Sequence, residues 1–212
     1  TTALTETELA YMGDFWHDHD FSDRVSDLVP NVPNLSHWFS DKAIAELSSI
    51  KRRCLDLPAK LRLFSLVVFS SVIRRVSNAA DQTQKTYVSH TLPKKPPAPA
   101  ELFPVFIDRA IAGMREYIEF LPVEPKGIVL KGDARSDLGN VSFQHVVTSP
   151  PYIDSIDYVY NQMLEYFWLL PELDVHTYER FRSLRKIPMG FKVHRYNESA
   201  FGLSKYLAEE SE

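Results

Sequence analysis

The sequence feature that most constrains the fold is a pair of prolines directly after a short apolar run. Val146 and Val147 are followed by Thr148-Ser149-Pro150-Pro151-Tyr152. Each proline fixes φ and removes a backbone donor, and the residue before a proline is held extended. The pattern predicts a short buried strand that opens into a stiff loop. Such a loop can hold a planar amine, because its oxygens accept N–H groups while the aromatic ring stacks on the amine's face.

A second motif lies upstream, where Gly127 to Leu130 and then Lys131-Gly132-Asp133-Ala134 read as a strand ending in Gly-Asp-Ala. Together the two motifs resemble the amino-methyltransferases, which methylate exocyclic amines of bases with S-adenosylmethionine. The Thr-Ser-Pro-Pro-Tyr form is most similar to the DNA cytosine-N4 branch. Adenine N6 stays open as the alternative within the same chemistry. The resemblance covers residues 125–170 and implies methylation of specific sites in double-stranded DNA, as in restriction–modification.

The resemblance also implies a role for each motif residue. The catalytic residues are Ser149, Pro150, Pro151 and Tyr152, and the cofactor-binding residues are Gly132, Asp133, Ala134 and Thr148. The Ser149 hydroxyl and the Pro150 carbonyl accept the two N–H groups of the target amine, while Tyr152 stacks on the flipped base. Methyl transfer is then direct, so Cys54 is not needed as a nucleophile, and we expect it to be a small buried residue.

Each of these residues also has an ordinary structural interpretation. Ser149 can cap its own turn, Asp133 can cap the turn after its strand, and Tyr152 can be a core aromatic. Asn161 and Gln162 can line a pocket, although the sequence gives no reason to choose them.

The order of the expected elements predicts an α/β protein. We expect a partial class I (Rossmann-like) methyltransferase sheet with a helical N-terminal portion. Residues 1–100 form the mainly helical segment, with a proline-rich connector at 93–99, and residues 101–212 form the α/β portion that carries both motifs. The two strands are expected at 128–130 and 143–147. Helices are expected at 5–11, 40–54, 58–77, 101–121, 156–170, 176–185 and 199–208.

One motif of the family is not recognisable in this chain. Methyltransferases that use S-adenosylmethionine carry a Phe-x-Gly-x-Gly turn, which lets the cofactor approach the backbone. The seven glycines here are Gly13, Gly113, Gly127, Gly132, Gly139, Gly190 and Gly202, and no two are close enough to form it. We therefore expect that turn upstream of Thr1 or on a second polypeptide. A non-catalytic subunit that binds nucleic acid or a partner is the alternative from a different class.

Charge is distributed unevenly along the chain. The net charge of −4 argues against non-specific nucleic-acid packaging, but it leaves room for a local basic surface. The basic residues after the proline loop are Arg180, Arg182, Arg185, Lys186, Lys192 and Arg195. We expect them to contact DNA phosphates, with a solvated helix face as the alternative. The basic runs 51–53 and 74–75 are expected on helix surfaces.

Other features of the sequence concern the cellular environment of the protein and a candidate metal site. Cys54 is the only cysteine, which rules out an internal disulfide and suits a reducing cytoplasm. The apolar stretch at 61–76 is interrupted by arginines and serines, so we expect no membrane span, and no secretory leader opens the chain. His17 and His19 alternate with acidic residues but have no further ligand cluster nearby, so we predict a solvated acidic loop and no metal site.

Overall fold

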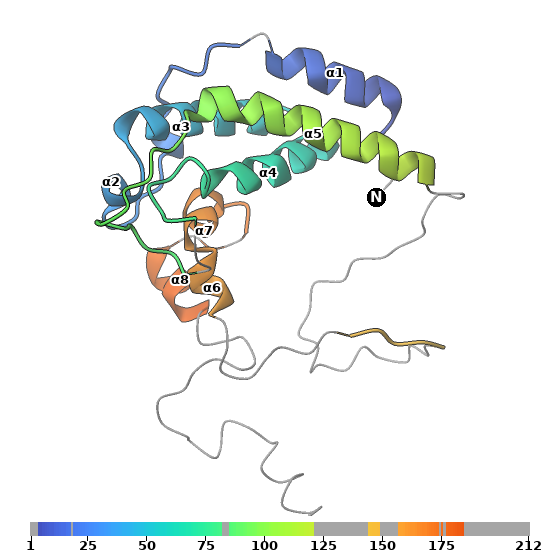
Figure 1. Ribbon diagram of the computed structural model, residues 1–212. Helices are drawn as coiled ribbons and strands as arrows, with labels where there is room; N and C mark the ends of the chain where they lie inside the picture. The colour runs from blue at the N-terminus through green and yellow to red at the C-terminus, as the bar shows by residue number, and fades with distance from the viewer. Residues whose placement is uncertain are drawn as a thin grey trace, which may run out of the picture.

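The regular structure is helical throughout the described part of the chain (Figure 1). The computed structural model describes residues 4–17, 19–81, 85–120, 144–148, 157–173, 175 and 177–184. The α-helices are α1 (Glu6–His17), α2 (Leu35–Trp38), α3 (Asp41–Leu55), α4 (Ala59–Ile73), α5 (Pro99–Phe120), α6 (Tyr158–Asn161), α7 (Met163–Leu169) and α8 (Tyr178–Leu184), with a 3-10 turn η1 (Ser26–Leu28). None of these described helices is long and apolar enough to cross a bilayer.

The core forms where α5 packs against α1, α3 and α4. Phe103, Ile107 and Ile111 lie four residues apart on α5 and are buried, as expected for the inner face of an amphipathic helix. The α5 N-terminus is capped from α3, because the buried Glu46 carboxylate accepts from the Ala100 backbone N–H at 2.8 Å. A negative charge is favourable at this positive end of a helix. The predicted helix at 101–121 is therefore confirmed, although it begins at Pro99.

The start and the buried face of α3 are confirmed. Ser40 Oγ accepts from the Ala43 N–H at 3.2 Å, which satisfies one of the free donors of the first turn. Every apolar residue expected on the inner face is buried: Ala43, Ile44, Leu47, Ile50 and Cys54. Burial raises the pKa of the Cys54 thiol far above its usual range, so Cys54 is an inert core residue.

The middle of α4 is apolar on all sides, and such a sequence predicts a buried helix. It is buried on one side only, through residues such as Val68, Phe69 and Val72. On the outer side Leu63 is 59% exposed and Val67 is 64% exposed. The prediction of complete burial is wrong because α3, α5 and α7 cover only the inner side within the described residues.

The C-terminal helices attach to this body through α7. Trp168 is fully buried, with its ring edge-on to Phe39 at 5.9 Å and to Phe69 at 6.1 Å between centroids. Phe181 of α8 packs in turn on Phe167, at 5.5 Å. Aromatic pairs in this geometry favour close packing. A chain of aromatic contacts thus links α8 through α7 to α4.

The predicted Rossmann-like sheet is not formed in the described residues, so the α/β assignment is corrected to a helical fold there. Residues 144–148 were expected to contain the second strand, but they have no regular structure, and Val147 is 98% exposed. The other predicted strand, at 128–130, lies outside the described residues. A strand needs a hydrogen-bonded neighbour and an apolar cover. The run Val146-Val147 has neither in this part of the chain, whereas the 3.6-residue periodicity of α3 and α5 gives each helix a core to pack on.

The division of the chain at residue 100 stays a prediction. The proline-rich connector before α5 is fixed to the end of α4 by Lys94. Its ammonium group donates to the Arg74 carbonyl at 3.0 Å and pairs with the Asp81 carboxylate at 2.8 Å. These two contacts hold the connector against the end of α4, just before α5 begins.

Candidate functional site between α4 and α7

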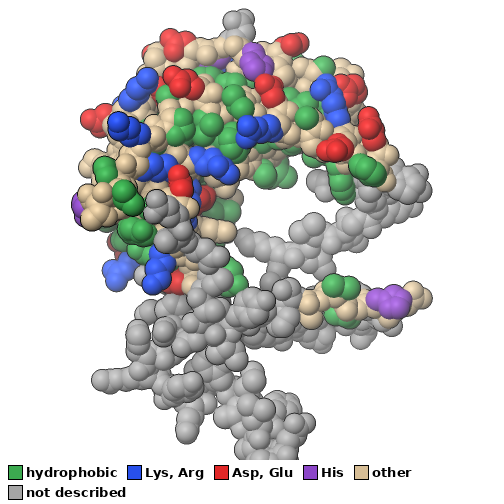
Figure 2. All heavy atoms as spheres, viewed as in Figure 1, with side chains coloured by type: hydrophobic (Ala, Val, Ile, Leu, Met, Phe, Trp, Pro, Cys, Tyr) green, Lys and Arg blue, Asp and Glu red, His purple; other side chains and the backbone are tan. Residues whose placement is uncertain are grey.

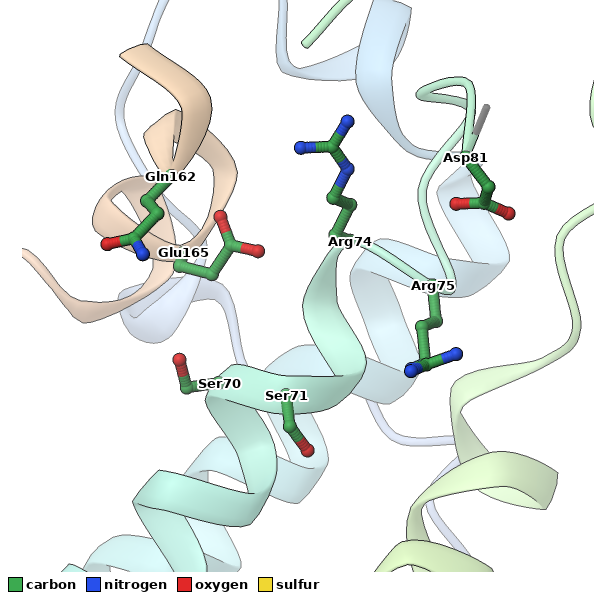
Figure 3. A pocket seen from close by; sticks show the side chains of 7 residues that line it. All are labelled: Ser70, Ser71, Arg74, Arg75, Asp81, Gln162 and Glu165. Atoms are coloured by element: carbon green, nitrogen blue, oxygen red, sulfur yellow. The ribbon is translucent and has the colours of Figure 1, made fainter. Parts of the chain in front are cut away.

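A polar pocket of about 460 Å³ opens between the C-terminal end of α4 and the beginning of α7 (Figure 3). Every residue that lines it carries a polar or charged group, although carbon atoms of these residues make up about half of the wall. The lining residues are Ser70, Ser71, Arg74, Arg75, Asp81, Gln162 and Glu165. Small-molecule sites usually combine apolar surface with a few polar groups, and this wall provides both.

Arg74 organises the pocket, because its guanidinium ties three segments together. It donates to the carbonyl of Asn161 at 3.2 Å, of Ala80 at 3.3 Å and of Lys85 at 3.2 Å. The Thr86 hydroxyl donates to the same Asn161 carbonyl at 2.9 Å. These bonds fix the short helix α6 against the end of α4. Arg74 therefore has a structural role, whereas the sequence analysis had predicted a residue on the helix surface.

Glu165 is the most perturbed group in the pocket. Its Oε2 atom is buried and has no hydrogen-bond partner among the described residues. Loss of water raises the pKa of the Glu165 carboxyl; its own backbone N–H and the charge of Arg74 oppose this in part. Figure 3 shows the carboxyl group turned toward the α4 side of the pocket. A buried acceptor without a donor can receive an N–H group from a ligand, and the raised pKa means that the carboxyl group keeps its proton to a higher pH than an exposed glutamate does.

We expect the pH dependence of stability to reveal this group. Because the folded-state pKa is raised, Glu165 favours the folded state below its unfolded pKa, and this stability is lost as pH rises through the folded pKa. Glu165→Gln should therefore be more stable than the parent at pH 7 and nearly equal to it at pH 4. Urea denaturation at both values measures this, with the exposed Glu116→Gln as control. A constant difference between Glu165→Gln and the parent across that range would contradict it.

Most of the predicted site residues fall outside the described residues. These are Gly132, Asp133, Ala134, Ser149, Pro150, Pro151, Tyr152, Arg185, Lys186, Lys192 and Arg195. Thr148 is described and is exposed. Arg180 and Arg182 are exposed on α8, on either side of the buried Phe181. Of the expected phosphate-binding set, Arg180 and Arg182 are the members that lie within the described residues, and they lie on different sides of α8.

The pocket contains residues that sequence reasoning did not select. Gln162 lines it, while Asn161 contributes its backbone carbonyl instead of its side chain. Glu165 could have been noticed, because it is the only charged residue in the otherwise apolar and aromatic run of α7. Ser70 and Ser71 had no such signal, since serines are common in helices that are partly exposed.

In the segment predicted to be a solvated acidic loop, His17 contacts α5. His17 Nε2 lies 2.9 Å from the Asp108 carboxylate, which ties the end of α1 to α5. The segment is therefore not entirely a loop, since α1 extends to His17. In the described part of the chain, no three His, Cys, Asp or Glu side chains gather as a metal site would require.

A helical body with a polar pocket and a buried carboxyl group can bind a ligand. These features alone do not identify a reaction. Comparison with known proteins found a distant likeness. The chain is 27% identical over 191 residues to the Type II methyltransferase M.MvaI of Kocuria varians, and the alignment covers 82% of this chain. That likeness, although distant, supports a place for the chain among the methyltransferases.

The match is partial on the side of the relative. The alignment covers 41% of M.MvaI, so the chain spans about two fifths of the length of the curated relative that it matches. No protein-family model matches the chain. No solved structure matches it either.

Proposed function

We propose that this chain is part of a DNA amino-methyltransferase and that it presents the exocyclic amine of a flipped base, cytosine N4, for methylation. The observation that carries the proposal is the sequence Thr148 to Tyr152, in a chain with a distant likeness to a type II methyltransferase. The motif ends five residues before Asp157, which caps α6 by accepting from the Tyr160 N–H at 2.9 Å. In the sequence, the motif is thus the segment directly upstream of α6 and α7, the helices that form one side of the polar pocket.

In this proposal the motif residues prepare a poor nucleophile. The lone pair of the amine is delocalised into the base, and two fixed acceptors, the Ser149 hydroxyl and the Pro150 carbonyl, favour a pyramidal nitrogen. Tyr152 stacks on the base after it leaves the duplex, while Pro151 keeps the loop stiff. S-adenosylmethionine supplies an electrophilic methyl group. As the bond from the nitrogen to the methyl carbon forms, the sulfur–methyl bond breaks and its electron pair leaves on sulfur as S-adenosylhomocysteine. The nitrogen then releases one proton to solvent, and alignment provides most of the rate gain.

The cofactor side of the site is shared in this proposal. Gly132, Asp133, Ala134 and Thr148 contact S-adenosylmethionine, and a segment upstream of Thr1 or a second polypeptide supplies the glycine-rich turn. The spacing of the seven glycines supports a shared site, since no two of them can build that turn. On the DNA side, Arg180 and Arg182 contact phosphates together with Arg185, Lys186, Lys192 and Arg195. The exposure of the two arginines on α8 supports this role.

Substitution of the motif tests the proposal. With the missing segment or partner polypeptide present, Ser149→Ala is expected to reduce methyl transfer to duplex DNA by about 100-fold or more, the usual effect of removing one fixed polar contact to the reacting group. Tyr152→Ala removes the surface on which the base stacks, worth about 1–3 kcal/mol, and is expected to reduce the transfer about tenfold or more. Transfer of a labelled methyl group measures the rate. Ser183→Ala and Tyr158→Ala are matched controls, because the Ser183 hydroxyl donates to the Arg180 carbonyl and Tyr158 is 43% exposed.

The product identifies the target. Digestion of the methylated DNA to nucleosides followed by mass analysis is expected to give N4-methylcytosine. N6-methyladenine would keep the reaction class and change the base. Full activity of Ser149→Ala and Tyr152→Ala would refute the assignment of the motif as the target-base site.

The glycine spacing also favours a second function, a non-catalytic subunit that binds nucleic acid or a partner. Titration calorimetry with S-adenosylmethionine separates the two. Heat of binding in the presence of the partner supports the enzyme. No heat for the chain alone or with the partner supports the binding subunit.

A further inference from the structure

Two guanidinium groups from different helical segments lie over one aromatic ring. Arg75 follows the end of α4, and its Cζ is 5.1 Å from the centroid of the Phe106 ring on α5. Arg109, also on α5, has its Cζ 5.4 Å from the same centroid. Cation–π contacts at this range are favourable and restrain the side chain. Both arginines are exposed, so their N–H donors face solvent from a restrained position.

No carboxylate among the described residues neutralises either group. The helix neighbours of Arg109, three and four residues away, are Val105, Phe106, Ala112 and Gly113, and none is acidic. The carboxylate nearest to Arg109 in sequence, Asp108, is paired with His17.

The same holds for Arg75. Asp81 lines the pocket with Arg75, but its carboxylate is paired with Lys94 at 2.8 Å. Figure 3 shows the Arg75 side chain directed away from Arg74. Two other arginines of the body are paired with carboxylates: Arg52 with Asp27 at 2.6 Å, and Arg115 with Glu6. Arg24 and Arg62 are exposed and have no carboxylate pair within the described residues, but no aromatic ring restrains them there. Arg75 and Arg109 are distinguished because both are without a carboxylate pair and lie over the same ring.

We propose that Arg75 and Arg109, held on Phe106, bind phosphate groups of the DNA backbone. Planar guanidinium groups can donate two parallel hydrogen bonds to phosphate oxygens. Each positive charge that pairs with a phosphate also releases counterions from the DNA, which makes binding more favourable. Blue Lys and Arg side chains are visible on the face where α4 and α5 lie (Figure 2). The inference rests on the proposed function, which makes DNA the substrate, and adds a contact distinct from residues 180–195.

The test compares two double variants of the full chain in binding to a fluorescent duplex. Arg75→Gln with Arg109→Gln is expected to weaken binding by about tenfold near 0.1 M salt and to reduce the slope of log K against log[salt] by about 2, one unit for each lost phosphate contact. Arg52→Gln with Arg115→Gln removes the same formal charge from carboxylate-paired arginines. That control is expected to change the affinity by about twofold or less, with the slope unchanged.

The outcomes separate this inference from the proposed function. If the parent chain binds duplex DNA and the Arg75/Arg109 variant binds with equal affinity and equal slope, the inference is overturned and the proposed function stands. If the parent with its partner does not bind DNA, both are overturned. Unchanged DNA binding with weaker association of the partner polypeptide would show that the pair serves a protein interface, which also overturns the inference. Circular dichroism verifies that the variants are folded.

Discussion

Replacing Lys51 with alanine is expected to lower the free energy of unfolding by about 3 kcal/mol, because a buried ion pair loses one partner. The Lys51 ammonium lies 2.6 Å from the Trp168 carbonyl and 3.1 Å from the Glu172 carboxylate, and its side chain is 3% exposed. The Glu172 side chain is 19% exposed, so it can regain part of its hydration. The effect therefore falls at the lower end of the range for buried pairs. The Trp168 carbonyl also loses its donor, which adds to the loss.

Urea denaturation measures this change, and α3 provides a matched control. Arg52 is on the same helix and also pairs with a carboxylate, Asp27 at 2.6 Å, but the two side chains are 43% and 69% exposed. Arg52→Ala is expected to cost about 0.5 kcal/mol or less. Lys51→Met retains most of the apolar stem, so its difference from Lys51→Ala separates packing from pairing. Similar losses for Arg52→Ala and Lys51→Ala would contradict the role of burial.

The helical part of the fold could be predicted wherever apolar residues repeat at the period of a helix. In α3 the cap at Ser40 and the buried positions through Cys54 agree with the sequence pattern. In α5 the same is true of Phe103 and Ile107. Capping and periodicity are local properties, so the sequence alone contains the information that decides them.

Features that depend on distant parts of the chain could not be predicted in this way. Lys51 belongs to a basic run that resembles a solvated surface, and only α7, over one hundred residues later, makes it a buried residue. The pocket has the same origin, since Ser70 and Glu165 meet only after α7 packs on α4. A pattern read along one segment does not specify which other segment will cover it.

The strand predicted at 143–147 shows the opposite error, because here the local sequence indicated a structure that the described residues do not form. The run Val146-Val147 before two prolines has the composition of a buried strand. A strand is stabilised by its neighbours, and in the described residues no second strand lies beside it. The chemical prediction does not depend on that strand. The motif Ser149 to Tyr152 stays a prediction, because it rests on the order of five residues and lies outside the described part of the chain.

Trp168 is expected to be the most costly single residue to truncate on the C-terminal side of the core. Its ring is fully buried and contacts Phe39 and Phe69, so Trp168→Ala removes the main link between α7 and the helical body. We expect a loss of about 3–5 kcal/mol, as for other large aromatic truncations. Trp168→Phe is expected to cost about 1 kcal/mol, because the Trp168 Nε1 donor has no hydrogen-bond partner in the described residues and nothing is lost with it.

Hydrogen exchange gives this prediction a local readout. If Trp168 holds α7 in place, the α7 amides in Trp168→Ala should exchange faster than those of α3, whose buried face contacts other residues. The Arg74 bond to the Asn161 carbonyl should weaken with them, since α6 precedes α7 directly. In Trp168→Phe the α7 amides should keep their protection. Equal acceleration of exchange in α3 and α7 would show instead that the helical body unfolds as one unit, and that the pocket wall cannot be loosened separately.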